Sequence, residues 1–108
     1  MSIQSTFHFV RATDTTLRFV LARSPGNVSS WQVKWAAAAQ TAPTLLVLQK
    51  TATIVDAVRG IFEVYLTVAD TLPLEPGNYL WELRRVNTGN VQQLASGLME
   101  LRPHLFVS

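Results

Sequence analysis

The chain has 108 residues, of which 48% are hydrophobic and 15% are charged, and its formal net charge is +2. This length predicts one domain over residues 1–108, and the apolar content excludes a disordered chain. The cations are few and scattered, which argues against a nucleic-acid partner, because neutralising several phosphates requires clustered lysines and arginines.

The first part of the chain predicts short strands separated by turns. Apolar and polar residues alternate around residues 7–11 and again over 16–23. Trp31 and Trp35 belong to the strongest alternation in the chain, so we expect them on the core side of the next strand. Residues 36–40 have good helix propensity but are too few for a stable helix, and they predict a strand end or a single turn.

The middle of the chain contains two further strand patterns. Residues 44–51 form an apolar segment in which no charge occurs before Lys50. Residues 61–68 alternate regularly, with Phe62 on the apolar side and Tyr65 on the polar side. We therefore expect Phe62 in the core and Tyr65 at the surface.

Residues 74–84 carry the most informative pattern, a Pro-Gly turn followed by Tyr79 and, two positions later, Trp81. In immunoglobulin-like sandwiches a tyrosine near the start of strand F donates its hydroxyl to the backbone of the preceding corner. The spacing predicts that the Tyr79 hydroxyl bonds to the backbone within residues 72–77. The Asn-Thr-Gly-Asn sequence at 87–90 then predicts a tight hairpin.

These elements together predict an all-β fold, an antiparallel two-sheet immunoglobulin-like sandwich of seven or eight strands. A small closed β-barrel is the alternative, because it produces similar alternation, and the tyrosine corner favours the sandwich. The large side chains expected in the core are Tyr79, Trp81, Trp31, Trp35 and Phe62.

The residues that could serve in catalysis or metal binding do not form a recognisable site pattern. His8 and His104 lie near opposite ends of the chain, and a metal site would need a third ligand. Glu63, Glu82 and Glu100 sit in three different strand patterns at outward positions, where cross-strand ion pairs with arginine or lysine are the ordinary outcome. Serine nucleophile and phosphate-loop motifs are absent. The sequence therefore predicts a protein that is not an enzyme, with no catalytic residue, no cofactor, no metal and no small-molecule ligand.

The composition also bears on the compartment. The chain has no cysteine, so no disulfide can form, and this fits folding in a reducing cytoplasm. The first residues lack the basic and apolar regions of a signal peptide, and no apolar run reaches the roughly 20 residues of a membrane helix. We expect no secretion signal and no membrane partner.

Protein contacts are the function that this sequence favours. Residues 44–48 are apolar and uncharged, and such a segment at a sheet edge invites another strand to pair with it. The candidate contact residues are Leu45 and Val47 in this segment, together with Tyr65. An outward tyrosine also leaves open an alternative function, a carbohydrate- or surface-binding module.

The segments 66–71, 74–84 and 94–101 resemble small immunoglobulin-like domains of bacteriophages and prophages, and are similar to the N-terminal domain of phage baseplate upper proteins. The opening around residues 9–15 is also similar, whereas the alanine-rich middle is not matched. The resemblance implies a virion-associated structural or adaptor protein, found in the virion or in the host bacterial cytoplasm during assembly. It also implies other virion subunits, or further copies of the chain, as partners.

Overall fold

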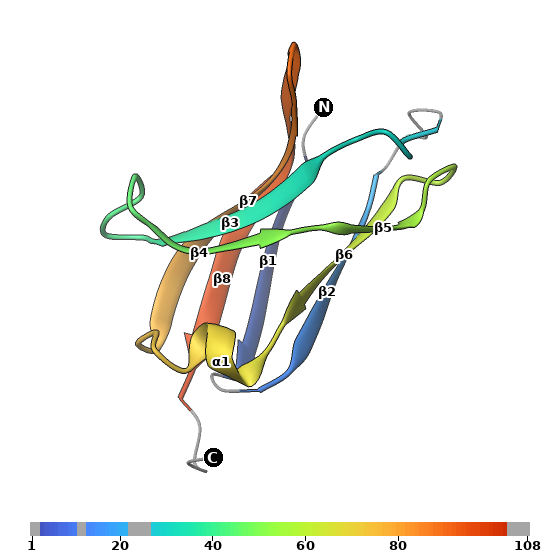
Figure 1. Ribbon diagram of the computed structural model, residues 1–108. Coiled ribbons are helices and arrows are strands. Elements are labelled where there is room, and N and C mark those ends of the chain that lie inside the picture. The colour runs from blue at the N-terminus through green and yellow to red at the C-terminus, as the bar shows by residue number, and fades with distance from the viewer. Residues whose placement is uncertain (1–2, 11–12, 22–26, 104–108) are drawn as a thin grey trace.

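Strands dominate the structure (Figure 1). The computed structural model describes residues 3–10, 13–21 and 27–103, and of residues 3–10 it describes the backbone alone. The described elements, in chain order, are β1 (Ile3–Val10), β2 (Thr15–Val20), β3 (Val33–Ala39), β4 (Leu46–Thr51), β5 (Thr53–Asp56), β6 (Ile61–Leu66), α1 (Val68–Thr71), β7 (Gly77–Asn87) and β8 (Asn90–Arg102).

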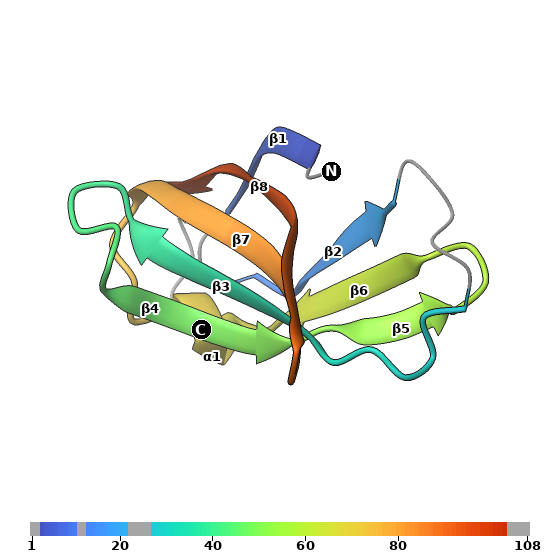
Figure 2. The same ribbon diagram turned by 90° about the horizontal axis from the view of Figure 1, so that it is seen from above.

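The strands form two sheets that face each other across the core (Figure 2). One sheet has the order β1-β8-β7-β3-β4 and the other β2-β6-β5. Neighbouring strands are antiparallel, except that β1 runs parallel to β8. Both sheets end in open edges, which excludes the closed barrel. The predicted immunoglobulin-like β-sandwich is confirmed.

The chain passes from one sheet to the other between β4 and β5. Ala52, the residue between these strands, is buried and donates its N–H to the carbonyl oxygen of Val33 at 2.9 Å. Figure 2 shows β4 and β5 lying almost end to end along this side of the sandwich. β4 is the edge strand of the five-stranded sheet, the position for which the sequence analysis considered residues 44–48. It begins at Leu46, because Thr44 and Leu45 belong to the preceding turn.

The core lies between the sheets and contains four of the five aromatic residues expected there. Trp35 and Phe62 are fully buried, and Tyr79 and Trp81 are 6% and 3% exposed. Trp31, expected in the core beside Trp35, lies instead half-buried at its rim, where the Arg85 guanidinium stacks 4.3 Å from the centre of its ring. Because β3 begins only at Val33, the alternation of the strand does not hold Trp31 inward.

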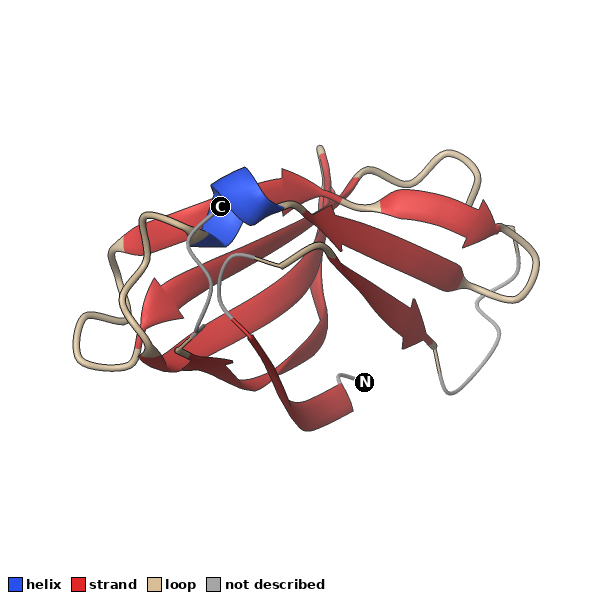
Figure 3. Ribbon diagram, turned by 90° about the horizontal axis from the view of Figure 1, so that it is seen from below, coloured by secondary structure: helices blue, strands red, loops and turns tan. Residues whose placement is uncertain are grey.

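Two short segments show how tertiary context decides local structure. Ala37 and Ala38 continue β3 and are buried, because small side chains fit where β3 packs against its neighbours. The helix is the single turn α1 (Figure 3), which the sequence analysis did not predict. Thr67 is its N-cap residue, and the carboxylate of Asp70 within the turn accepts hydrogen bonds from the N–H and the hydroxyl of Thr67. No helix in the described ranges is long and apolar enough to cross a membrane.

The tyrosine corner can be tested by removing one oxygen atom. The Tyr79 hydroxyl donates a hydrogen bond to the carbonyl oxygen of Glu75, within the segment where the sequence placed its acceptor. Tyr79→Phe is expected to lower the free energy of unfolding by about 0.5–1.5 kcal/mol, the usual net contribution of one hydrogen bond. Urea denaturation followed by tryptophan fluorescence would measure this loss. Tyr65→Phe is the matched control, since the exposed Tyr65 hydroxyl donates to the side chain of Glu63 at the surface and not to the backbone of a corner. Equal losses in the two variants would contradict a special role for the corner.

Candidate functional site: a protein-contact surface

The strand carboxylates are engaged in ion pairs. In the part of the chain that the structure describes, no three His, Cys, Asp or Glu side chains gather to hold a metal ion. The side chain of His8 and the whole of His104 lie outside the described residues. Each of the three strand glutamates has an arginine partner: Arg18–Glu63 at 3.6 Å, Arg84–Glu82 at 2.5 Å and Arg102–Glu100 at 2.9 Å.

Apolar side chains are exposed where the chain enters β4. Leu45 is 66% exposed, Leu46 54% and Val47 36%. Leu45 and Val47 were the contact residues expected from the sequence, and the structure places them together at the sheet edge. Three consecutive exposed apolar residues at an open edge are unusual, because such positions are ordinarily protected against association.

These residues continue into an apolar row across the outer face of the five-stranded sheet. The strand register places Leu46 opposite Ala38, Ala38 opposite Leu80, and Leu80 opposite Leu98. Residues that are directly opposite in a sheet point to the same face, and the alternate set, which includes Trp81 and Met99, is buried in the core. Leu46, Ala38, Leu80 and Leu98 therefore form what we call the outer apolar row, in which Leu46 and Leu98 are 54% and 37% exposed, Leu80 is half-buried and Ala38 is buried between its neighbours.

β4 carries a β-bulge at Val47. Ala37 pairs with Leu48 and Ala38 with Leu46, so Val47 is the extra residue of the edge strand. A bulge increases the local twist and bends the strand that contains it. Beyond this point, Leu48–Thr51 pair with Ala37–Lys34 in uninterrupted register. The strand thus has a distorted first half and a regular second half.

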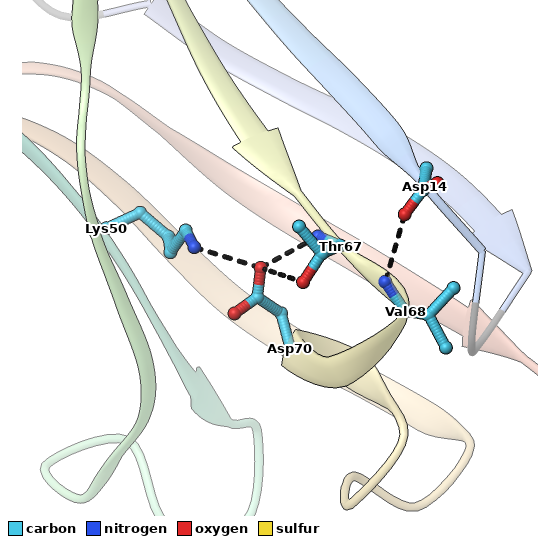
Figure 4. A network of polar contacts seen from close by, with 5 residues as sticks. All are labelled: Asp14, Lys50, Thr67, Val68 and Asp70. Atoms are coloured by element: carbon cyan, nitrogen blue, oxygen red, sulfur yellow. Dashed lines mark hydrogen bonds and ion pairs between the residues drawn. The ribbon is translucent and has the colours of Figure 1, made fainter.

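An ion pair connects the regular half of β4 to α1 (Figure 4). Lys50 Nζ lies 3.0 Å from Asp70 Oδ2, and the two side chains are 29% and 19% exposed. Burial alone would raise the pKa of the Asp70 carboxyl, but hydrogen bonds from the Thr67 N–H, from Lys50 and from the Thr67 hydroxyl outweigh burial and lower this pKa. Asp14 supports the same corner by accepting a hydrogen bond from the Val68 N–H at 3.1 Å.

Tyr65 belongs to a different surface. It lies in β6, in the other sheet, and is 45% exposed. Its hydroxyl donates to Glu63 Oε1 at 2.7 Å, and this hydrogen bond is the main reason why the pKa of the Tyr65 hydroxyl is raised. The structure therefore brings Leu45 and Val47 together but keeps Tyr65 apart from them.

Sequence reasoning missed three members of the outer apolar row. Leu80 and Leu98 each stand next to buried residues in long apolar strands, and alternation would have placed them on the outer face. Their alignment with Leu46 depends on how β4, β3, β7 and β8 pair, and this register cannot be read from the sequence. Ala38 was missed because its alanine-rich segment has no alternation to interpret.

Comparisons with known proteins show the fold alone. No protein-family model matches the chain, and neither does any curated protein. Among solved structures, CopC from Methylosinus trichosporium OB3b is similar with a TM-score of 0.53 and 15% identity, covering 94% of this chain and 87% of that one. The extracellular domain of the voltage-gated sodium channel beta4 subunit gives a TM-score of 0.47 at 8% identity, covering 97% of this chain and 96% of that one. A second sodium channel beta subunit structure gives 0.46 at 10% identity, covering 94% and 92%. At 15% identity the likeness to CopC supports the β-sandwich fold alone, and the resemblance to phage domains stays a prediction.

Proposed function

We propose that the protein is a non-enzymatic structural or adaptor module that acts through protein–protein contacts, with β4 and the outer apolar row as its contact surface. One observation carries the proposal: four of the exposed large apolar residues described, Leu45, Leu46, Val47 and Leu98, gather on one edge and one face of the same sheet. Apolar side chains exposed together on one sheet mark interaction sites in proteins that are otherwise well cored. The sequence resemblance makes virion subunits, or further copies of the chain, the candidate partners, and makes the virion or the host cytoplasm the place of action.

The proposal is tested by placing a charge in the row. Leu46→Lys should abolish binding to a partner that uses this surface, because burying an unpaired ammonium against apolar groups is strongly unfavourable. Binding would be measured by calorimetry against purified products of the neighbouring genes, and self-association by sedimentation. Since Leu46 is 54% exposed, the variant should fold normally.

Val91→Lys is the matched control. Val91 is also an exposed apolar strand residue, at 62%, but it lies in the β7–β8 hairpin away from the row. Equal effects of the two substitutions would contradict the proposed surface. If Leu46→Lys leaves all binding intact while Tyr65→Ala abolishes binding to glycans, the alternative of a carbohydrate- or surface-binding module replaces the proposal.

A further inference from the structure

The regular half of β4 is an open sheet edge, and the charge of Lys50, its one charged residue, is paired with Asp70 of α1. We propose that the protein forms a two-fold dimer by antiparallel pairing of β4 with β4 of a second copy, and that the Lys50–Asp70 ion pair makes this edge available. The inference rests on the proposed function, because it names a second copy of the chain as the partner.

Among the edge strands whose side chains the structure describes, β4 is the best suited to pairing. The edges of the two sheets are β1, β4, β2 and β5, and the structure describes the side chains of the last three. β2 exposes Arg18 at 56% of its side chain, and β5 is only four residues long and ends at Asp56. The exposed side chains of β4 are uncharged: Leu46, Val47, Gln49 and Thr51. Unpaired backbone groups between uncharged side chains are what an added strand needs.

Self-pairing sets a stricter condition than pairing with another protein. A two-fold axis brings a strand against its own copy, so any charge near the axis meets the same charge, and like charges that face each other are destabilising. Lys50 is the one charged residue of β4, and it lies within the regular segment Leu48–Thr51. A β4–β4 pair is therefore favourable only if the Lys50 ammonium is neutralised.

Asp70 supplies this neutralisation. Register places Lys50 opposite Trp35, which is fully buried, so the lysine side chain leaves β4 on the core side of the sheet. Its ammonium reaches Asp70 of α1, and Figure 4 shows the two side chains extended toward each other from β4 and α1. Two copies can then approach with the Lys50 charge of each edge already paired with Asp70.

A bulge and an inward-pointing charge can also protect an edge against strand addition, and the Asp70 counter-ion is what distinguishes β4 from such an edge. Bulges and inward-pointing charges normally prevent strand addition, the second because the added strand would bury the charge. Here the bulge at Val47 leaves Leu48–Thr51 regular, and the inward charge already has its counter-ion. Without Asp70, pairing would bury an uncompensated ammonium, which is costly.

The test is a double-substitution cycle measured by sedimentation equilibrium on the full chain. Asp70→Asn should weaken the dimer by about tenfold or more, although residue 70 lies on α1 and not on the pairing edge. Adding Lys50→Met to this variant should restore most of the wild-type affinity, because the uncompensated charge is then gone. Restoration also separates the effect on dimerisation from any loss of folding, which circular dichroism would monitor.

Two further variants sharpen the result. Asp56→Asn is the matched control: the Asp56 carboxylate also accepts backbone N–H bonds, from Val58 and Arg59, and pairs with Arg59, but it lies away from β4. It should leave the dimer unchanged. Gln49→Glu places a charge on the exposed side of the regular segment without touching the ion pair, and it should weaken the dimer by about tenfold or more.

Several results would overturn the inference. One is a wild-type protein that remains monomeric at about 1 mM. A second is an Asp70→Asn variant that dimerises as the wild type does. A third is a Lys50→Met variant that associates more tightly than the wild type, because Lys50 would then be a residue that prevents association at this edge. A monomeric wild type that still loses a partner on Leu46→Lys would overturn this inference and leave the proposed function standing.

Discussion

Trp81→Ala should lower the free energy of unfolding by about 3–5 kcal/mol, the range found when a large aromatic side chain is truncated in a core. Trp81 is 3% exposed, and its ring centre lies 5.2 Å from that of Phe19 on the opposite sheet. Its indole N–H also donates to the carbonyl oxygen of Leu98 at 3.2 Å. The substitution thus removes an inter-sheet contact, a hydrogen bond and the largest side chain of β7.

The expected loss is a large fraction of the about 5–15 kcal/mol that stabilises a typical domain. Guanidinium denaturation, monitored by far-ultraviolet circular dichroism, would show a lower midpoint or an unfolded chain. Trp31→Ala provides the comparison, because Trp31 lies half-buried at the rim and should cost clearly less. A Trp81→Ala midpoint equal to that of the wild type would contradict the position of Trp81 in the core.

Trp35→Ala should be as damaging, at about 3–5 kcal/mol, but Trp35→Phe should be far milder than Trp81→Phe. Both indoles are buried, yet Trp35 Nε1 has no hydrogen-bond partner among the described residues, whereas Trp81 Nε1 has one. A buried donor without an acceptor costs about 1–3 kcal/mol, and phenylalanine removes that donor. Removing the unsatisfied donor at residue 35 therefore offsets part of the free energy lost with the smaller side chain. At residue 81 the substitution removes a satisfied hydrogen bond, so no such offset exists.

Denaturant midpoints of the two phenylalanine variants would decide this. If Trp35→Phe is the more destabilising of the pair, the volume of the indole outweighs its unsatisfied N–H and the expectation is wrong. The alanine variants serve as the internal reference, since both remove volume and the indole N–H together.

Patterns that are local in the sequence predicted much of this fold. The alternation through Phe62, Val64 and Leu66 gave β6 and its buried side, and the Pro-Gly-Asn-Tyr sequence placed the Tyr79 hydroxyl at the corner. The Asn-Thr-Gly-Asn hairpin joins β7 and β8 with Gly89 at φ +82°, a conformation that glycine adopts without strain. In each case the interactions of a few residues close in sequence are enough to determine the local structure.

Features that depend on pairing were not predictable in this way. The outer apolar row needs the register of β4, β3, β7 and β8, and one bulge at Val47 shifts that register by a residue. The direction of Lys50 follows from its position opposite Trp35, which only the pairing of β3 and β4 reveals. The α1 turn is an intermediate case, because the Thr67-to-Asp70 spacing is a local capping signal, whereas the pairing of Asp70 with Lys50 depends on the tertiary fold.

The parallel pairing of β1 with β8 has a mechanical consequence. Ile3 lies opposite Ala95 and Val10 opposite Arg102, so β1 begins at one end of the sandwich and β8 finishes at the other. A pulling force applied at Ile3 and Arg102 would run along these two strands in opposite directions and load their hydrogen bonds in shear. Bonds loaded in shear resist together, whereas those of a hairpin pulled open at one end break one after another. Tension applied along β1 and β8 would therefore meet the combined resistance of these hydrogen bonds, which would suit the contact function proposed above.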